Sequence, residues 1–274
     1  MKLKDFFALL GFKKPSVSYG YELEDFTLES EGKVSFAQWQ HPKYGRTTFD
    51  QASVDALRRY ISPGSTVIDI GAHSGDTSVL FALAAGPDGV VFAVEPNRYV
   101  LPILRKNASL NPDAARIEVL PFAATHAPCR MTFNYSDNGY CNGGDLGEET
   151  KWSHGHVYPL EVEGRNVIDE IVSAEPDRLD RTALVKTDTE GNDLSVLKSM
   201  KELIGRTRPH IMAEVYTRTP ASERRAFLSW LDEMGYDAYL VDSWTDLTSV
   251  EVKVDDVMNW KHYDVFCVHR DRKI

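Results

Sequence analysis

Cysteine is scarce in this sequence of 274 residues, and long apolar runs are missing. The three cysteines, Cys129, Cys141 and Cys267, are widely spaced and form no CxxC pair, so the sequence carries no zinc or redox motif of that kind. No stretch approaches the length of a transmembrane helix. We therefore expect a protein of a reducing, cytoplasmic compartment.

Basic residues are fewer than acidic residues. The sequence holds 31 basic and 41 acidic residues, a formal net charge of −10, and its Lys and Arg residues form no long run. A polyanion would meet a repelling field, and no stripe of basic and aromatic residues offsets it. We expect no nucleic-acid partner, which leaves small molecules and glycans as ligands.

The first 48 residues differ from the rest of the chain. Residues 1–15 hold the short apolar stretch 6–10 between lysines, too short for a signal peptide and without a small-residue cleavage site. An amphipathic helix docked on the body is the simpler interpretation, and the alternative is peripheral contact with the inner face of a membrane. Residues 20–48 alternate in short steps and predict a small strand-rich lead-in.

Residues 49–274 predict a single α/β domain. Apolar runs indicate strands at 66–70, 90–94, 117–120, 184–186 and 210–215, and helical spacing indicates helices at 50–61, 77–85, 98–110, 194–204 and 222–234. Strands at 239–241 and 265–268 are expected to close the sheet as an antiparallel pair. The result is a doubly wound, mostly parallel sheet with helices on both faces. Residues 126–163 fit no such repeat and are expected to form an inserted loop region.

The strongest chemical signal is the segment 67–77, a strand that ends in a glycine turn and opens a helix. Gly71 and Gly75 are expected to bring main-chain amides close to a ligand, in a G-x-x-x-G spacing preceded by the acid Asp69. A dinucleotide fingerprint would read G-x-G-x-x-G, so a pyrophosphate is not the obvious ligand.

A second acid, Glu95, stands about 20 residues further on, at the end of the next strand. A carboxylate at that position accepts hydrogen bonds from both hydroxyls of a ribose, so the pair of signals predicts a nucleoside-type cofactor. We assign the following residues to its site: Asp69, Gly71, Ala72, His73, Ser74, Gly75, Thr77, Glu95, Pro96, Asn97, Ala123 and Ala124.

Over residues 50–214 the sequence resembles the FkbM family of methyltransferases. The resemblance lies in the glycine-turn segment 67–75, in 94–97, in Leu104 with Asn107 and Asn111, and above all in 185–191, which looks like the family's K-I-D-x-E-G signature. His73 stands where the family often has Asn, and Thr187 where Ile is common. The resemblance implies a Rossmann-like seven-stranded fold, S-adenosylmethionine as methyl donor, and most often an oxygen acceptor on a sugar, glycolipid or natural product.

Three carboxylates are candidates for chemistry at the acceptor. Asp188 and Glu190 follow the fourth expected strand, beside the first, and Glu214 ends the fifth. A carboxylate there would take the acceptor's proton as the general base, or the three would hold magnesium or calcium. Helix capping is the alternative role for Asp188 and Glu190.

Other side chains give weaker signals. His154 and His156 are candidates for a base or a metal ligand, and Tyr216 and Trp152 for stacking on a sugar. Cys141 fits a turn better than a nucleophile. The alternative functions are an NAD(P)-dependent oxidoreductase or epimerase, a non-catalytic cofactor-binding module, and methyl transfer to nitrogen or carbon. The sequence carries no signal for an oligomeric state.

Overall fold

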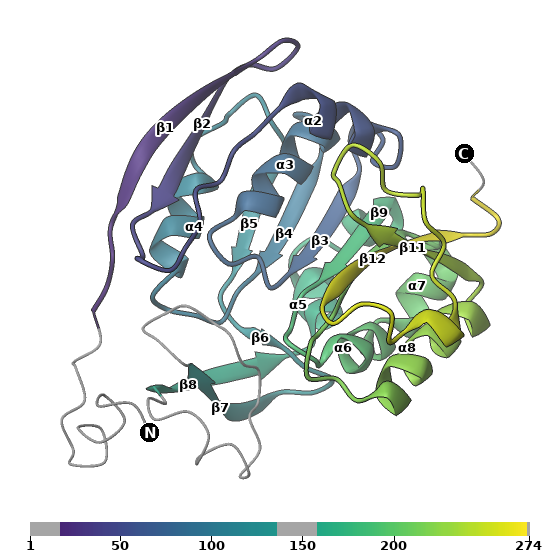
Figure 1. The fold of residues 1–274 in the computed structure, drawn as a ribbon. Helices are drawn as coiled ribbons and strands as arrows, with labels where there is room; N and C mark the ends of the chain where they lie inside the picture. The colour runs from purple at the N-terminus through teal and green to yellow at the C-terminus, as the bar shows by residue number, and fades with distance from the viewer. Residues whose placement is uncertain (1–16, 136–157, 273–274) are drawn as a thin grey trace.

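A computed structural model describes residues 17–135 and 158–272, and its centre is a seven-stranded sheet (Figure 1). All neighbouring strands pair in parallel except around β12, which runs antiparallel to both β10 and β11. This confirms the predicted fold class and its antiparallel C-terminal pair. Across the sheet the strands are β11 (Tyr236–Val241), β12 (Tyr263–His269), β10 (His210–Val215), β9 (Thr182–Thr187), β3 (Thr66–Ile70), β4 (Val90–Val94) and β5 (Arg116–Leu120).

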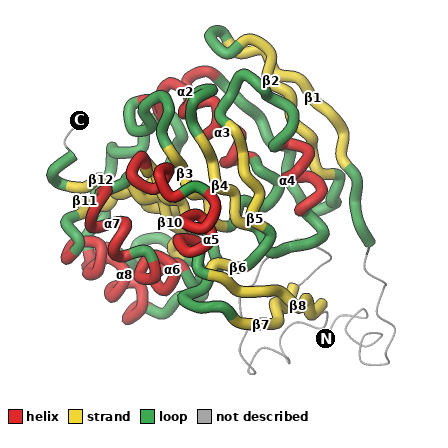
Figure 2. Tube along the Cα trace, turned by 180° about the vertical axis from the view of Figure 1, so that it is seen from behind, coloured by secondary structure: helices red, strands yellow, loops and turns green. Residues whose placement is uncertain are grey.

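Helices cover both faces of this sheet, as Figures 1 and 2 show from opposite sides. One face carries α2 (Gln51–Arg58), α3 (Asp76–Ala85) and α4 (Leu101–Asn107), and the other carries α5 (Val167–Ala174), α6 (Asp193–Ser199), α7 (Lys201–Thr207) and α8 (Ala221–Glu233). Two short 3₁₀ helices, η2 (Pro176–Arg181) and η3 (Val254–Asp256), lie in the connections. None of the helices in the described ranges is both long and apolar enough to span a bilayer.

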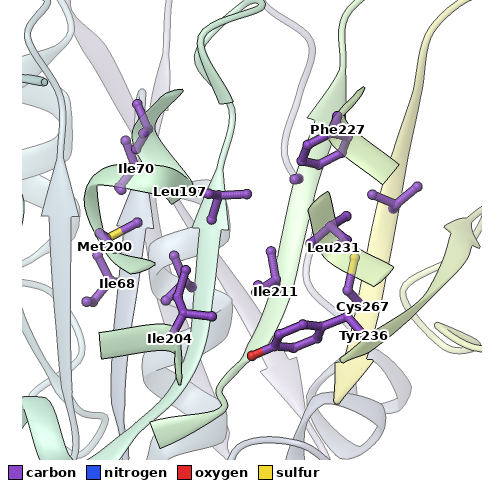
Figure 3. Close-up of a cluster of buried hydrophobic side chains, with 14 of the residues drawn as sticks. Ile68, Ile70, Leu197, Met200, Ile204, Ile211, Phe227, Leu231, Tyr236 and Cys267 are labelled. Carbon is purple, nitrogen blue, oxygen red and sulfur yellow. The ribbon is translucent and has the colours of Figure 1, made fainter. Parts of the chain in front are cut away.

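The two apolar cores follow from the period of two along each strand. Ile68, Val185 and Ile211 face the α5–α8 layer, whereas their neighbours Leu184 and Met212 face α2 and α3. Figure 3 shows part of the first core, where side chains of α6, α7 and α8 lie over those of the sheet. Because successive residues are buried on opposite faces, each central strand is fully buried, and its sequence is mostly apolar.

The N-terminal hairpin, β1 (Tyr21–Leu28) with β2 (Gly32–Trp39), packs beside α4. Two asparagine side chains imitate a neighbouring strand. Asn107 accepts the N–H of Ala37 (2.6 Å) and donates to the Ala37 carbonyl (3.2 Å), and Asn111 does the same for Ser35 at 2.9 and 3.0 Å. The edge of β2 is therefore satisfied by side chains, and its apolar face joins the core over α2 and α3.

A second, three-stranded sheet lies below the ends of β3 and β4 in Figure 1. It consists of β6 (Ala123–Ala124), β7 (Cys129–Tyr135) and β8 (Tyr158–Arg165), with β7 and β8 antiparallel. The prediction of a loop throughout 126–163 is thus wrong at both ends of that segment. The single helix predicted at 194–204 is also two helices, separated at Met200, and the helix predicted at 98–110 is limited to α4.

Candidate active site

A cavity of about 440 Å³ opens at the carboxyl ends of β3, β4, β9 and β10. The chain winds outward from β3 through β4 to β5, and later outward on the other side through β9 and β10, so the cavity lies where the winding reverses. Open α/β sheets bind ligands at such a reversal because two connections leave the edge in opposite directions there. The strand order confirms the expected placement of β9 beside β3.

The glycine turn forms one wall of the cavity. Gly71 and Gly75 have φ angles of +79° and +91°, which favour glycine, and His73 between them has a φ of +48°. A Cβ atom on Gly71 would overlap the carbonyl oxygen of Asp188, and one on Gly75 would lie 2.8 Å from Cδ1 of Leu104. Both glycines are therefore required by contacts within the protein, whereas the sequence suggested a close approach to the ligand.

His73 lines the cavity in a ring of aromatic side chains. Its imidazole lies 5.2 Å from the ring of Trp39 and 5.1 Å from that of Tyr44, centroid to centroid. Burial lowers the pKa of His73 to about 4, so the ring is neutral at physiological pH. The Tyr44 hydroxyl lies 2.7 Å from Oγ of Ser74, which ties the segment after β2 to the glycine turn.

Glu95 follows β4 and reaches into the cavity from a largely buried position. Its Oε2 accepts the N–H of His73 (2.9 Å) and its Oε1 the N–H of Asn97 (2.7 Å), so the main chain fixes both oxygens. Burial raises the pKa of this carboxyl to about 7, against the opposing effect of the two N–H groups. Each oxygen retains a lone pair, which gives the carboxylate capacity for two further donors.

Lys186 on β9 contacts acidic and main-chain groups from β3 and from the turns after β3 and β9. It is paired in register with Asp69 on β3, and its Nζ lies 3.4 Å from that carboxylate, 3.5 Å from Asp188 and 3.4 Å from the Gly71 carbonyl. Burial lowers the pKa of Lys186, but the carboxylates of Asp69 and Asp188 outweigh it and raise the pKa overall. The ammonium group therefore stays charged and links the ends of two central strands.

The turn between β9 and α6 presents Glu190 to the cavity. Glu190 has a φ of +57°, rare for a residue with a side chain, and Asp193 stabilises the turn by accepting the N–H groups of Thr189 (3.2 Å) and Gly191 (3.3 Å). Burial, with the charges of Asp188 and Asp193, raises the pKa of Glu190 to about 8. Burial likewise raises the pKa of Asp193 to about 6.

Glu214 at the end of β10 meets Glu190 inside the cavity. Its Oε2 accepts the N–H of Glu190 at 3.2 Å, and its Oε1 lies 3.5 Å from Nε2 of His262. Burial, together with the negative charges of Asp188 and Glu190, raises the pKa of Glu214 to about 10. At neutral pH Glu214 is therefore mostly protonated, whereas Glu190 titrates close to the working range.

The loops beside these carboxylates are held by a buried guanidinium. Arg224 on α8 donates all five of its N–H groups to main-chain carbonyls. The acceptors are Thr219, Val257, Trp260, Tyr216 and Lys261, at 2.7 to 3.0 Å. Tyr216, which hydrogen-bonds to Glu190, and His262, beside Glu214, lie at the ends of the two loops that Arg224 joins.

The structure divides the predicted site residues into two groups. Those that line the cavity are Gly71, His73, Thr77, Glu95, Pro96, Ala123, Ala124, Asp188, Glu190 and Glu214. Asp69, Ala72, Ser74, Gly75 and Asn97 lie outside the lining and support it; Asp69, for example, accepts the hydroxyls of Thr77 (2.9 Å) and Ser78 (2.6 Å). Within residues 17–135 and 158–272, no three or more His, Cys, Asp or Glu residues are arranged to hold a metal ion.

The other residues that the sequence singled out are not among the described residues that line the cavity. Cys141, Trp152, His154 and His156 fall outside the described residues. Tyr216 is buried rather than presented for stacking on a ligand. His262 and Tyr44 also line the cavity, although the sequence analysis did not predict them. Both lie far from the motifs in the sequence, so no local pattern identifies them as site residues.

Comparisons with known proteins give one family and several distant structural likenesses. The family model described as "Methyltransferase FkbM domain" matches residues 69–238, more than half of the chain. Among solved structures, an FkbM methyltransferase from Methylobacillus flagellatus KT matches with 15% identity and a TM-score of 0.43, covering 78% of this chain; the chain spans only half of that protein. An S-adenosylmethionine-dependent O-methyltransferase from Thermotoga maritima matches with 12% identity and a TM-score of 0.43, covering 92% of this chain and 79% of its own.

A comparison with curated proteins found no match. The two structural likenesses are distant and carry no argument by themselves. The family model, in contrast, spans the glycine turn, Glu95 and the carboxylates of the cavity, and with the strand order it is sufficient for assignment. This chain belongs to the FkbM family of S-adenosylmethionine-dependent methyltransferases.

Proposed function

We propose that this protein transfers the methyl group of S-adenosylmethionine to a hydroxyl group of a small molecule, glycan or glycolipid, with Glu190 as the general base. The observation that carries the proposal is the convergence of Glu95, Glu190 and Glu214 on one cavity from the ends of three strands. In a member of this family, this convergence supports roles for Glu95 in binding the ribose of the donor and for Glu190 as the base.

The residues of the cavity fit the donor. Glu95 has two lone pairs free for a ribose diol, and Ile70, Val94 and Pro96 offer apolar surface for a base. The carboxylates of Asp76 and Asp188 suit a ligand with positive charges. When bound, S-adenosylmethionine supplies an electrophilic methyl group on a sulfonium. The chain's own contribution there is to hold the donor in line with the acceptor oxygen.

Glu190 is the strongest candidate for the base. A hydroxyl group is a weak acid, and a carboxylate whose pKa is raised to about 8 is a stronger base than an ordinary one. As the acceptor oxygen takes the methyl group, the methyl–sulfur bond would break and leave neutral S-adenosylhomocysteine. The hydroxyl proton would pass to Glu190, while Glu214 would keep its own proton. Asp188 is less suited because it is exposed and close to Lys186. The proposal uses no metal ion, and assays with and without magnesium test that choice.

The first experiment is calorimetric titration with S-adenosylhomocysteine, with NAD⁺ as the comparison ligand. We expect micromolar binding of the former and none of the latter. Glu95→Ala should weaken binding about 100-fold, since two charge-assisted hydrogen bonds are worth about 3 kcal/mol together. Glu118→Ala, which removes an exposed carboxylate on the next strand, is the matched control and should bind normally. Preference for NAD⁺ would overturn the proposal.

A further inference from the structure

Three aromatic side chains, Trp39, Tyr44 and His73, lie together beside Glu95, and we call them the aromatic wall. Tyr44 and His73 line the cavity with their ring centroids 5.1 Å apart, and the nearly buried Trp39 packs against them at 5.7 and 5.2 Å. Trp39 and Tyr44 belong to the N-terminal hairpin and the segment after it, outside residues 69–238 that match the family model. The aromatic wall is therefore a feature that this chain adds to the matched motifs.

The aromatic wall lies between the two parts of the cavity that the donor must join. The main-chain N–H of His73 donates to Glu95 at 2.9 Å. Burial lowers the pKa of the His73 imidazole and the charge of Asp188 opposes that effect, so this ring lies near both acids. In a donor whose diol is bound by Glu95, the sulfur is attached one carbon from the ribose ring, and its methyl group must point toward Glu190. The sulfonium then lies beside Tyr44 and His73.

An aromatic surface suits a sulfonium because this cation has no N–H or O–H to donate. The π face of a tyrosine attracts a cation strongly enough to change its affinity about 2- to 30-fold. His73 does not repel the cation, because burial lowers its pKa to about 4 and keeps the ring neutral. Lys186 also lines the cavity, but its charge is matched by the carboxylates of Asp69 and Asp188.

The position of the Tyr44 ring is fixed by contacts on two sides. Its hydroxyl lies 2.7 Å from Oγ of Ser74 and 3.2 Å from Oγ1 of Thr47. Trp39 meets His73 edge-on, at an interplanar angle of 69°, and holds the two cavity-lining rings together from the buried side. A ring held in this way loses little rotamer freedom when a ligand binds, so its attraction for a cation is not offset by an ordering cost.

We propose that Tyr44, together with the neutral ring of His73, binds the sulfonium of the donor and makes the protein prefer S-adenosylmethionine to S-adenosylhomocysteine, whose sulfur is neutral. Methyl transfer removes the charge of the sulfur and with it the attraction to the aromatic wall, so the product leaves more readily than the donor. This proposal rests on the proposed methyl transfer, and it adds the residues that select the charged form of the ligand.

The test is calorimetric titration with three ligands of nearly the same shape. S-adenosylmethionine carries a sulfonium, sinefungin carries a protonated amine in its place, and S-adenosylhomocysteine has a neutral sulfur. Tyr44→Leu removes the ring, whereas Tyr44→Phe keeps the ring and loses only the hydroxyl that contacts Ser74. Tyr21→Leu, at an exposed position of β1 outside the cavity lining, is the matched control.

We expect the wild type and Tyr21→Leu to bind the two charged ligands more tightly than S-adenosylhomocysteine. Tyr44→Phe should keep most of this preference, and Tyr44→Leu should lower it about 3- to 10-fold. A ring with a purely structural role would change the affinity for all three ligands by the same factor. If Tyr44→Leu fails to fold, phenylalanines with one to three fluorine atoms at position 44 give the same test. Fluorine withdraws charge from the ring face and keeps its shape, so the preference should fall with each atom.

Three outcomes would overturn this inference only. They are the absence of a preference in the wild type, an unchanged preference in Tyr44→Leu, and a preference that does not respond to fluorination. Failure of the wild type to bind either S-adenosylmethionine or S-adenosylhomocysteine would overturn the methyl-transfer proposal itself.

Discussion

The Oε2 atom of Glu214 accepts the main-chain N–H of Glu190 at 3.2 Å, across the ends of two neighbouring strands. This bond fixes the positive-φ conformation of Glu190 and places two carboxyl groups with raised pKa values in one cavity. Two carboxyl groups that lie this close together do not both ionise at the same pH, because their negative charges repel each other. Both carboxyls are therefore mostly protonated at neutral pH, and Glu190 is the first of the two to lose its proton as the pH rises through about 8.

The rate of methyl transfer should depend on the ionisation of Glu190. With a pKa of about 8, the base is protonated below that pH, so kcat/KM should fall about tenfold per pH unit below pH 8 and level off above it. Glu190→Gln should lower kcat by about 10² to 10⁴-fold and abolish this dependence. Glu202→Gln, at an exposed position of α7, is the control. A profile that keeps its inflection near pH 8 in Glu190→Gln would assign the base to another group.

Replacing Glu214 by Gln should make the protein more stable than the wild type at alkaline pH. Burial raises the pKa of Glu214 in the folded protein from 4.5 to about 10. Between pH 4.5 and pH 10 the folded protein therefore binds more protons than the unfolded chain, and the wild type loses stability as the pH rises. Gln mimics the protonated form. Glu214→Gln should gain about 1–3 kcal/mol at pH 9 and little at pH 5 in urea unfolding. Glu233→Gln, an exposed change on α8, should gain nothing at either pH.

Substitution of glycine should have opposite effects at two positions. Gly71→Ala puts a methyl group into the Asp188 carbonyl at a positive φ, so it should prevent folding or abolish S-adenosylhomocysteine binding. Gly205→Ala lies in α7 with open space around its Cβ and should stabilise by about 0.5–1 kcal/mol. Thermal unfolding of both variants measures the contrast. A folded Gly71→Ala that binds normally would contradict the contact with Asp188.

The Arg224 guanidinium should be irreplaceable by another cation. Lysine has three donors in a different geometry, so Arg224→Lys leaves buried carbonyls without partners and should cost about 3 kcal/mol or more in urea unfolding. The neighbouring Arg225 is exposed, and Arg225→Lys should cost nearly nothing. Because Arg224 holds the loops of Tyr216 and His262, we also expect Arg224→Lys to raise KM for the acceptor. Equal stability of the two variants would contradict this role.

The sequence located most closely the strands with continuous apolar runs, and it missed two strands whose apolar pattern is interrupted by charges. The strands 90–94 and 210–215 were located to the residue because apolar runs there are bounded by turn residues. Strands β7 and β8 were missed because Arg130, Glu161 and Glu163 interrupt any apolar pattern and the partners are separated by a long segment. The helix break at Met200 was hidden because apolar spacing continues across it.

For the site, local motifs identified residues that lie close in sequence. Gly71, Glu95 and Asp188 were found because each ends a recognisable strand. His262 lies 48 residues after its partner Glu214, with no local pattern to join the two, so only the antiparallel return of β12 brings them together. The role of the glycines was misread for a related reason: the atoms that exclude a side chain, in Asp188 and Leu104, belong to other elements.

Asn107 connects the N-terminal hairpin to the glycine turn. Nδ2 of Asn107 donates to the carbonyl of Ser74 at 2.8 Å while its amide also holds Ala37 of the hairpin. We therefore expect the hairpin and the glycine turn to open together, so that a ligand that orders the turn also slows the opening of the hairpin. Amide hydrogen exchange at Ala37 therefore reports donor occupancy from outside the cavity.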